Sequence, residues 1–290
     1  MTLDMNLVRR LVRAALDEDR ADDDVTTRAL VPPEQKGRAE LIAKSSGVLA
    51  GLMLARETFA TVDPDLIWSE ERADGERVAP GDRIATVEGS LASILRGERV
   101  ALNFLTHLSG VATAANEIVR MLDGTGCRLR DTRKTIPGLR ALEKYATRMG
   151  GAVNHRFDLS DGVLVKDNHL AAVYARDLTI GDAVRMARAG APGMKVEVEV
   201  TTPEEARQAA DAGADELLLD NMTPAQVREV VAALEAGENR PVLEASGGIT
   251  AQNAREYAEA GVDYVSMGAI THSAPALDMS LEIEKAARSD

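Results

Sequence analysis

The second half of the chain repeats one pattern, and this pattern constrains the fold more than any other feature. From about residue 125, short runs of Val, Leu and Ile alternate with Ala-rich segments that have helical spacing. The candidate strands are residues 128–131, 163–166, 196–200, 217–220, 242–245 and 264–267. The last four begin 21, 25 and 22 residues apart, which is enough for one strand and one helix each. Serial strand–helix units predict a parallel sheet, and we favour a barrel because no GxGxxG motif follows a strand.

Capping residues support the same interpretation. Thr202 and Thr223 each stand before a proline that suits the first position of a helix, and Thr250 is expected to begin a third helix. Two of these segments end in Ala-Gly-Xaa-Asp, with Gly213 and Gly261 at positions where a left-handed conformation ends a helix.

The first hundred residues have a different pattern, in which helical and strand segments are mixed. We expect an amphipathic helix over about 5–17 and short strands at 39–43 and 83–87. Apolar residues then recur every three or four positions from about 90 to 121, which predicts a long helix with a break near Ser109-Gly110.

Composition excludes several classes of protein. The 290 residues contain 34 Lys and Arg against 47 Asp and Glu, a net charge of −13, so the phosphate backbone of a nucleic acid would repel the chain. No apolar run approaches the roughly 18 residues that a membrane span needs, and the charged N-terminus does not resemble a secretory signal. A single cysteine, Cys127, excludes an intrachain disulfide and suits a reducing compartment. We therefore expect a cytoplasmic protein that binds neither membranes nor nucleic acid.

Nearly every candidate strand in the second half ends in residues that are costly to bury. Barrel enzymes build their sites at the carboxyl ends of strands, so these residues are candidates for a shared site. They are Asp131, Arg133, Lys134, Lys166, Glu197, Glu199, Asp220, the run Ser246-Gly247-Gly248, and Gly268. Glu197 and Glu199 share a strand face, and we expect Glu199 to be the one that contacts a ligand.

The charges are unevenly distributed. Residues 128–166 carry a net charge of +5, from nine basic and four acidic residues, whereas residues 196–236 carry −8, from two basic and ten acidic residues. Around one barrel mouth they would form a basic wall for anions and an acidic wall for hydroxyls, a metal or a developing cation. The glycines near 247 and 268 allow a phosphate to approach the backbone. The expected ligand is therefore polyanionic in part.

Several motifs occur together in a specific order. They are Asp24-Val25-Thr26-Thr27, Gly97-Glu98-Arg99-Val100-Ala101-Leu102-Asn103, Asp131-Thr132-Arg133-Lys134-Thr135, Asn154-His155-Arg156, Val165-Lys166-Asp167-Asn168-His169, Glu197-Val198-Glu199, Leu219-Asp220-Asn221 and Glu244-Ala245-Ser246-Gly247-Gly248. In these motifs, and over essentially its whole length, the chain resembles the quinolinate phosphoribosyltransferases.

This resemblance implies an N-terminal open α/β sandwich over residues 1–110, completed by 275–290, and an incomplete α/β (TIM-like) barrel over 111–274. It also implies a homodimer with shared active sites and a magnesium-dependent reaction. In that reaction, quinolinate and phosphoribosyl pyrophosphate give nicotinate mononucleotide, pyrophosphate and carbon dioxide for NAD biosynthesis.

The resemblance also assigns roles to individual residues. It implies that the quinolinate carboxylates meet Arg133, His155 and Arg156, with Arg99 supplied by the partner subunit. Lys134 and Lys166 would face the pyrophosphate, with Lys166 also near quinolinate, and Glu199 and Asp220 would hold the ribose hydroxyls and organise Mg²⁺. The 5′-phosphate would lie against Ser246, Gly247, Gly248 and Gly268.

Three alternatives remain open from the residues themselves. Lys166 at a strand end could act as the amine of a Schiff-base lyase. The chain could be a sensor that binds a sugar phosphate without turnover, or a transferase for another acceptor base. His107 is expected to be a packed or interface residue, while His169 and His272 receive no role from the sequence.

Overall fold

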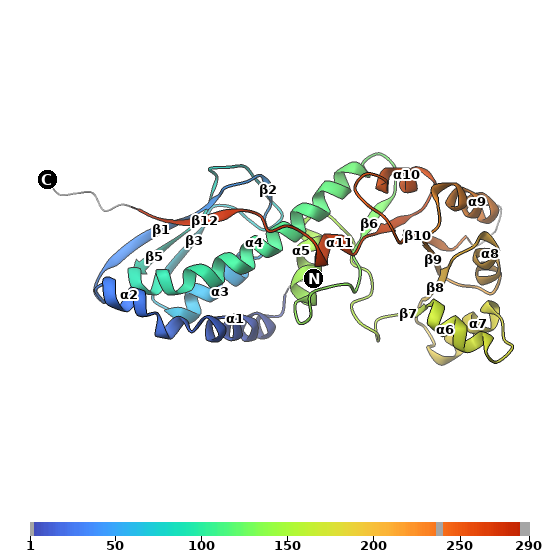
Figure 1. Ribbon diagram of the computed structural model, residues 1–290, viewed down its shortest axis with the longest axis horizontal. Coiled ribbons are helices and arrows are strands. Elements are labelled where there is room, and N and C mark those ends of the chain that lie inside the picture. The colour runs from blue at the N-terminus through green and yellow to red at the C-terminus, as the bar shows by residue number, and fades with distance from the viewer. Residues whose placement is uncertain (1–2, 236–239, 285–290) are drawn as a thin grey trace. The chain divides into compact units, whose positions relative to one another are not determined.

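The computed structural model describes residues 3–235 and 240–284, which form two compact units (Figure 1). The first unit comprises residues 1–116, 136–151 and 273–290, and the second comprises 117–135 and 152–272. This division differs from the expected boundaries chiefly at 136–151, which belongs to the first unit. The expected C-terminal addition to the sandwich runs to residue 290, and its last part, 285–290, lies outside the described residues.

The first unit contains both helices and strands, and its two longest strands have eight residues each. Its elements are α1 (Met5–Asp19), the 3₁₀ turn η1 (Ala21–Asp23), α2 (Val25–Leu30), β1 (Lys36–Ala43), β2 (Gly47–Val48), α3 (Leu52–Val62), β3 (Ile67–Glu70), β4 (Arg77–Val78), β5 (Arg83–Ser90), α4 (Leu91–Met121), α5 (Arg140–Met149) and β12 (Met279–Ile283). The last five residues of α4 belong to the second unit.

An antiparallel sheet with the order β12-β1-β5-β3 forms the centre of the first unit. β12, from the end of the chain, pairs with β1 in a register that places Leu281 opposite Leu41, as the adjacent red and blue strands of Figure 1 show. Alternate residues of β1 are buried. They pack in one core with residues of α3 and α4 such as Leu52 and Leu105, so helices cover one face of the sheet.

α5 belongs to the first unit because its apolar face is buried there. Leu142 and Ala146 are fully buried in the same apolar cluster as Val8 and Val12 of α1. Burying such a face stabilises an amphipathic helix more than its intrinsic helix propensity does.

The predicted break in the long helix near Ser109-Gly110 is wrong, because α4 is continuous through these residues. A Cβ atom at Gly110 would lie 2.1 Å from the carbonyl oxygen of Pro275. The glycine therefore permits close approach of the C-terminal backbone rather than ending the helix.

The second unit alternates strands and helices as its sequence predicts. Its elements are β6 (Arg128–Arg130), β7 (Val163–Val165), α6 (Asp167–Tyr174), α7 (Ile180–Gly190), β8 (Val196–Val200), α8 (Pro203–Asp211), β9 (Glu216–Asp220), α9 (Pro224–Leu234), β10 (Val242–Ser246), α10 (Ala254–Glu259), β11 (Tyr264–Ser266) and α11 (Ala269–His272). Thr202 and Thr223 cap α8 and α9, and Gly213 has a φ of 89° just after α8, so these predictions are confirmed.

The six strands form one parallel sheet with the order β6-β11-β10-β9-β8-β7. Within the described residues, no pairing joins β6 to β7, so the barrel is incomplete, as expected. Parallel pairing brings all the carboxyl ends of the strands to one edge of the sheet. This edge is where the polar strand-end residues gather.

The third predicted helix begins later than expected. Thr250 does not open it; α10 begins at Ala254 after Asn253. The side chain of Asn253 accepts a hydrogen bond from the Thr250 N–H at 2.7 Å and donates one to the Gly248 carbonyl at 3.0 Å. These bonds hold residues 248–253 in a turn, so the glycine pair does not lead directly into a helix.

None of the helices in residues 3–235 and 240–284 combines the length and apolar character needed to cross a bilayer.

Candidate active site

A pocket of about 280 Å³ lies in the second unit, at the carboxyl ends of the parallel strands. All its lining residues come from this unit: Asp131, Thr132, Arg133, Lys134, His155, Arg156, Leu164, Lys166, Glu199, Leu218, Asp220, Glu244, Ser246 and Ser266. Asp220, Ser246 and Ser266 end β9, β10 and β11, and Lys166 follows β7 directly. The pocket therefore draws residues from strands that are far apart in the sequence.

Basic side chains crowd one part of the pocket. Burial and the charge of nearby Arg133 lower the pKa of Arg156, which shows the electrostatic cost of placing these cations together. The buried Nε atom of Arg133 has no hydrogen-bond partner among the described residues. The same holds for the buried Oγ atom of Ser266 in the same lining. An anionic ligand would satisfy these donors and offset the repulsion between the cations.

Two carboxylates lie in the same pocket. Glu199 accepts a hydrogen bond from the Lys166 ammonium at 2.7 Å, and Asp220 accepts one from the Asn221 side chain at 2.6 Å. Burial raises the pKa of Asp220, and the charge of Glu199 adds to this effect. Because the charge of Glu199 disfavours ionisation of Asp220, a cation bound between the two would stabilise the site.

Asp131 fixes one wall of the pocket. It is fully buried, and its carboxylate accepts hydrogen bonds from the Asn154 side chain at 2.7 Å and from the His155 backbone N–H at 2.8 Å. It thereby holds the segment that carries His155 and Arg156. Sequence analysis listed Asp131 as a charged residue at a strand end and gave it no role. Its position immediately after a strand is the feature of the sequence that indicates a place in the site.

A buried ionic network lies beside the pocket. Arg130 Nη1 donates to Glu216 and to Glu244, both at 2.7 Å, and its guanidinium lies 3.7 Å from the centre of the Tyr264 ring. Glu244 is 1% exposed and also lines the pocket. Sequence analysis assigned no role to Arg130, Glu216, Glu244 or Ser266. Alternation along short strands does not reveal which inward-facing charges are paired.

The glycines expected to hold a phosphate lie in two places. Gly247 and Gly248 have φ angles of 83° and 63°, directly after the pocket residue Ser246, and a Cβ at Gly247 would lie 2.4 Å from Asn221 Oδ1. A Cβ at Gly268 would come within 2.9 Å of the Lys134 side chain. The position of Gly247 therefore requires a residue without a side chain, whereas at Gly268 the missing side chain leaves room for Lys134.

Several expected residues lie elsewhere. Arg99 belongs to α4 of the first unit, and 65% of its side chain is exposed. The basic residues of α5, counted in the positive segment, also belong to the first unit, and Lys144 among them is buried. Only some of the basic residues of the positively charged segment 128–166 therefore line the pocket.

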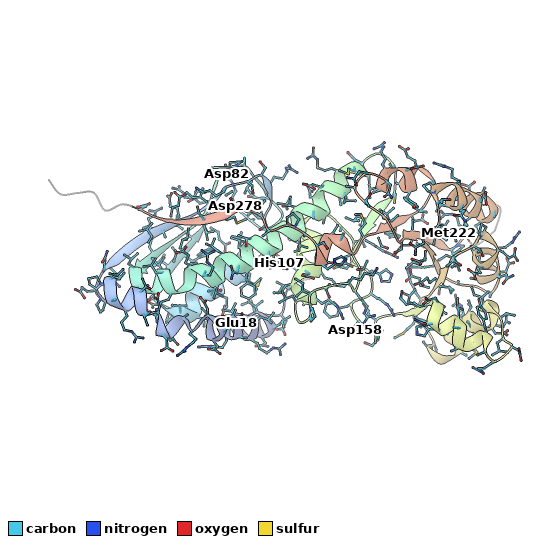
Figure 2. The ribbon with its side chains drawn as sticks, viewed as in Figure 1. Glu18, Asp82, His107, Asp158, Met222 and Asp278 are labelled. Atoms are coloured by element: carbon cyan, nitrogen blue, oxygen red, sulfur yellow. The ribbon has the colours of Figure 1, made fainter. Side chains whose placement is uncertain are left out.

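The remaining histidines have local roles. His107, labelled on α4 in Figure 2, lies 3.0 Å from a carboxylate oxygen of buried Glu143, which agrees with a packed histidine. His169 Nδ1 accepts the Lys166 backbone N–H at 2.9 Å and caps α6. The ring of His272 lies against Gly268, since a Cβ there would be 3.2 Å from its Nε2 atom.

An incomplete α/β barrel with a polarised pocket at its carboxyl edge defines an enzyme for a partly anionic substrate. Residues 24–109 match the family described as "Quinolinate phosphoribosyl transferase, N-terminal domain", and residues 111–282 match its C-terminal domain. The chain belongs to the quinolinate phosphoribosyltransferase family, as its motifs predict.

Individual relatives agree with this assignment. The "Probable nicotinate-nucleotide pyrophosphorylase (carboxylating)" of Bacillus subtilis (strain 168) is 41% identical over 277 residues, which cover 95% of this chain and 93% of that protein. The human "Nicotinate-nucleotide pyrophosphorylase (carboxylating)" is 42% identical over 258 residues, with coverage of 88% and 85%. The solved structure of the nicotinate-nucleotide pyrophosphorylase from Francisella tularensis has a TM-score of 0.90 and 36% identity, and covers 98% of each chain.

Proposed function

We propose that this protein transfers the phosphoribosyl group of phosphoribosyl pyrophosphate to quinolinate and releases pyrophosphate and carbon dioxide. The product, nicotinate mononucleotide, serves NAD biosynthesis. Membership of the family supports this function. The observation that carries it is the convergence of Arg133, Arg156, Lys166, Glu199 and Asp220 on one pocket.

The basic wall is suited to a dicarboxylate. Arg133 and Arg156 present planar guanidinium groups that pair with carboxylates through two hydrogen bonds, and His155 lies beside them in the lining. We assign the two quinolinate carboxylates to this wall. The partnerless Nε of Arg133 is one of the donors that such a carboxylate would satisfy.

The acidic wall is suited to the transfer step. Breaking the bond between C1 of the ribose and the pyrophosphate oxygen builds positive charge on the sugar ring, which Glu199 and Asp220 stabilise. Lys134 and Lys166 stabilise the negative charge that builds on the departing pyrophosphate. Ser246, Gly247, Gly248 and Gly268 hold the 5′-phosphate. The pocket thus separates the two developing charges.

The donor set also fits Mg²⁺, which the family implies as a cofactor. Glu199 and Asp220 offer carboxylate oxygens, the hard ligands that this ion prefers, and Mg²⁺ commonly uses one or two carboxylates together with substrate phosphates. When bound, the ion neutralises phosphate charge. Glu199 and Asp220 would hold it directly or through water.

Decarboxylation then needs little from the protein. Once the ring nitrogen carries the ribose, its positive charge stabilises the electron pair that stays on the ring carbon when the carboxylate leaves as carbon dioxide. This carbon then takes up a proton from solvent, which completes nicotinate mononucleotide. The chain's contribution is to fix the ring and exclude water while the charge develops.

An assay of pyrophosphate and carbon dioxide release tests this function. With quinolinate, both products should appear in equal amounts, whereas nicotinate, which lacks the second anchoring carboxylate, should give little pyrophosphate. Release of neither product with quinolinate would refute the function. Efficient turnover of nicotinate would instead favour a transferase for another acceptor base.

The alternative of a Schiff-base lyase is disfavoured by the geometry. The Lys166 side chain is ion-paired with Glu199 at 2.7 Å, so its nitrogen is held by a carboxylate rather than free to attack a carbonyl carbon. Burial raises the pKa of the Cys127 thiol to about 12, so this side chain offers no thiolate either.

Replacing Arg133 with lysine should raise the KM for quinolinate about 10- to 100-fold, because lysine keeps the charge but loses the paired hydrogen bonds. Steady-state kinetics at saturating phosphoribosyl pyrophosphate measure this effect. The matched control is Arg207→Lys on α8, whose partner is the exposed Glu204. A near-normal KM in Arg133→Lys would show that Arg133 does not hold a carboxylate.

We also propose a homodimer in which Arg99 of one subunit completes the other subunit's pocket. The exposed Arg99 side chain supports this, since it is available to a second chain. Mixing equal amounts of inactive Arg99→Ala and Lys134→Ala dimers under subunit exchange should restore about one quarter of normal activity, because about half of the dimers are then mixed and each mixed dimer has one of its two sites intact. Verified exchange without recovery would exclude a shared site. A cytoplasmic location stays a prediction from the sequence.

A further inference from the structure

His155 separates two cavities of the second unit. It lines the candidate active-site pocket and also a second cavity of about 190 Å³, whose lining includes Arg130, Lys195, Glu197 and Glu216. Glu197 lines only the second cavity. The ring of His155 therefore has the substrate pocket on one side and buried charged groups on the other.

Glu197 is bonded to His155 through one oxygen. His155 Nε2 lies 2.8 Å from Glu197 Oε2, and because an ionised carboxylate only accepts hydrogen bonds, Nε2 carries the hydrogen and donates it. Glu197 is 5% exposed, and its other oxygen, Oε1, has no hydrogen-bond partner among the described residues. The hydrogen bond between them thus fixes both the buried Glu197 carboxylate and the His155 ring.

Charged groups face the ring from three strands. Glu197 lies on β8 and Arg130 on β6. Glu244 lies on β10, with a carboxylate oxygen 3.9 Å from His155 Nε2. A further charged residue, Arg156, follows His155 directly in the sequence. Burial disfavours the charged ring, but the hydrogen bond and charge of Glu197 outweigh this, and the pKa of His155 is raised. Glu244 is hydrogen-bonded to Arg130 at 2.7 Å, which leaves Glu197 as the carboxylate that is hydrogen-bonded to the ring.

These groups do not make a metal site. The ligand atoms of His155, Glu197 and Glu244 lie within 4.8 Å of one another, which is close enough to hold an ion. However, the Arg130 guanidinium lies 2.7 Å from Glu244 and already supplies a cation there. The arrangement instead supports the charge and position of the histidine.

We propose that Glu197 is a positioning residue that keeps His155 charged and fixed in the wall of the quinolinate pocket. The proposal rests on the function proposed above for the substrate that His155 meets. A neutral imidazole would offer a carboxylate no net charge, whereas the imidazolium attracts it. Quinolinate binding therefore depends on pH through His155: it is strong while the ring is protonated and weakens as pH rises through the pKa of the ring in the folded protein.

The first test needs no substrate. The chain contains four histidines, and NMR titration of ¹⁵N-labelled imidazoles, with His155→Gln to identify the signal, measures the His155 midpoint. In the unmodified protein we expect a midpoint above the ordinary value of about 6.5. In Glu197→Gln, which keeps the shape but loses the charge, the midpoint should fall. An ordinary or lower midpoint in the unmodified protein, or an unchanged one in Glu197→Gln, overturns the proposal.

The second test separates positioning from catalysis. Glu197→Gln should raise the KM for quinolinate about 10- to 100-fold at neutral pH while kcat and the KM for phosphoribosyl pyrophosphate change little. The rise of KM with pH should begin at lower pH in this variant, and Glu197→Asp should restore part of the affinity. Glu204→Gln, an exposed carboxylate on α8, is the matched control. A fall in kcat with unchanged KM would contradict the proposal.

The two tests fail independently. If the protein does not turn over quinolinate, the proposed function fails, but the titration still decides whether Glu197 sets the charge of His155. If turnover is normal and the titration midpoint does not depend on Glu197, only the positioning role fails.

Discussion

Replacing Asp220 with alanine is expected to lower kcat by about 10²- to 10³-fold while the affinity for quinolinate changes little. Asp220 ends β9 at the acidic wall, where it and Glu199 face the sugar ring and Mg²⁺ in the proposed reaction. Its carboxylate gains importance only as positive charge develops during bond breaking, so its loss affects the transition state more than the bound acceptor.

Steady-state kinetics and calorimetric titration with quinolinate separate these effects. Asp211→Ala, which removes an exposed carboxylate at the end of α8, is the matched control and should leave both quantities near normal. A variant with weakened quinolinate binding and normal kcat would place Asp220 on the acceptor side and refute the role assigned to it.

Replacing Arg130 with methionine should destabilise the second unit by roughly 3–5 kcal/mol. Arg130 bonds to both Glu216 and Glu244 at 2.7 Å, and its loss leaves Glu244 almost fully buried without its closest cation. Glu216 keeps Lys195 as a partner at 2.8 Å. The destabilisation should therefore arise mainly from Glu244, and chemical denaturation measures it as a change in the free energy of unfolding.

A second substitution checks this explanation. Arg130→Met combined with Glu244→Gln should recover much of the lost stability, because the amide carries no charge to bury. The gap between Arg130→Met and the unmodified protein should also narrow as pH falls and Glu244 becomes protonated. Burial opposes ionisation of Glu216, but its bonds to Lys195 and Arg130 lower its pKa below the ordinary value. The stability that Glu216 contributes is therefore fully present above the pKa that this group has in the unfolded chain. It is lost only as pH falls through the lower pKa that the group has in the folded protein. If the double variant is no more stable than the single one, the assignment to Glu244 is wrong.

The parallel sheet could be predicted because its signals are local. β8 has the predicted bounds at both ends, since a short Val-rich run is followed at once by a Thr-Pro helix start. The continuity of α4 could not be predicted, because the residue that explains Gly110 is Pro275, far away in the sequence. The placement of α5 likewise depends on α1, which accepts its apolar face.

The site was predictable to the extent that its residues stand at strand ends. Arg133, Lys166, Glu199 and Asp220 all line one pocket, although their roles stay predictions until tested. Asp131 and Glu244 could not be assigned in this way, because a buried carboxylate can face a ligand, a backbone N–H or another charge. Only the three-dimensional partners, such as Arg130 for Glu244, distinguish these cases.

The chain changes from one compact unit to the other four times, after residues 116, 135, 151 and 272. No single cut therefore yields two complete halves: a break near residue 110 removes α5 and β12 from the sheet and helices that they pack against. Exchange of either unit between related proteins by one crossover would therefore separate elements that pack together.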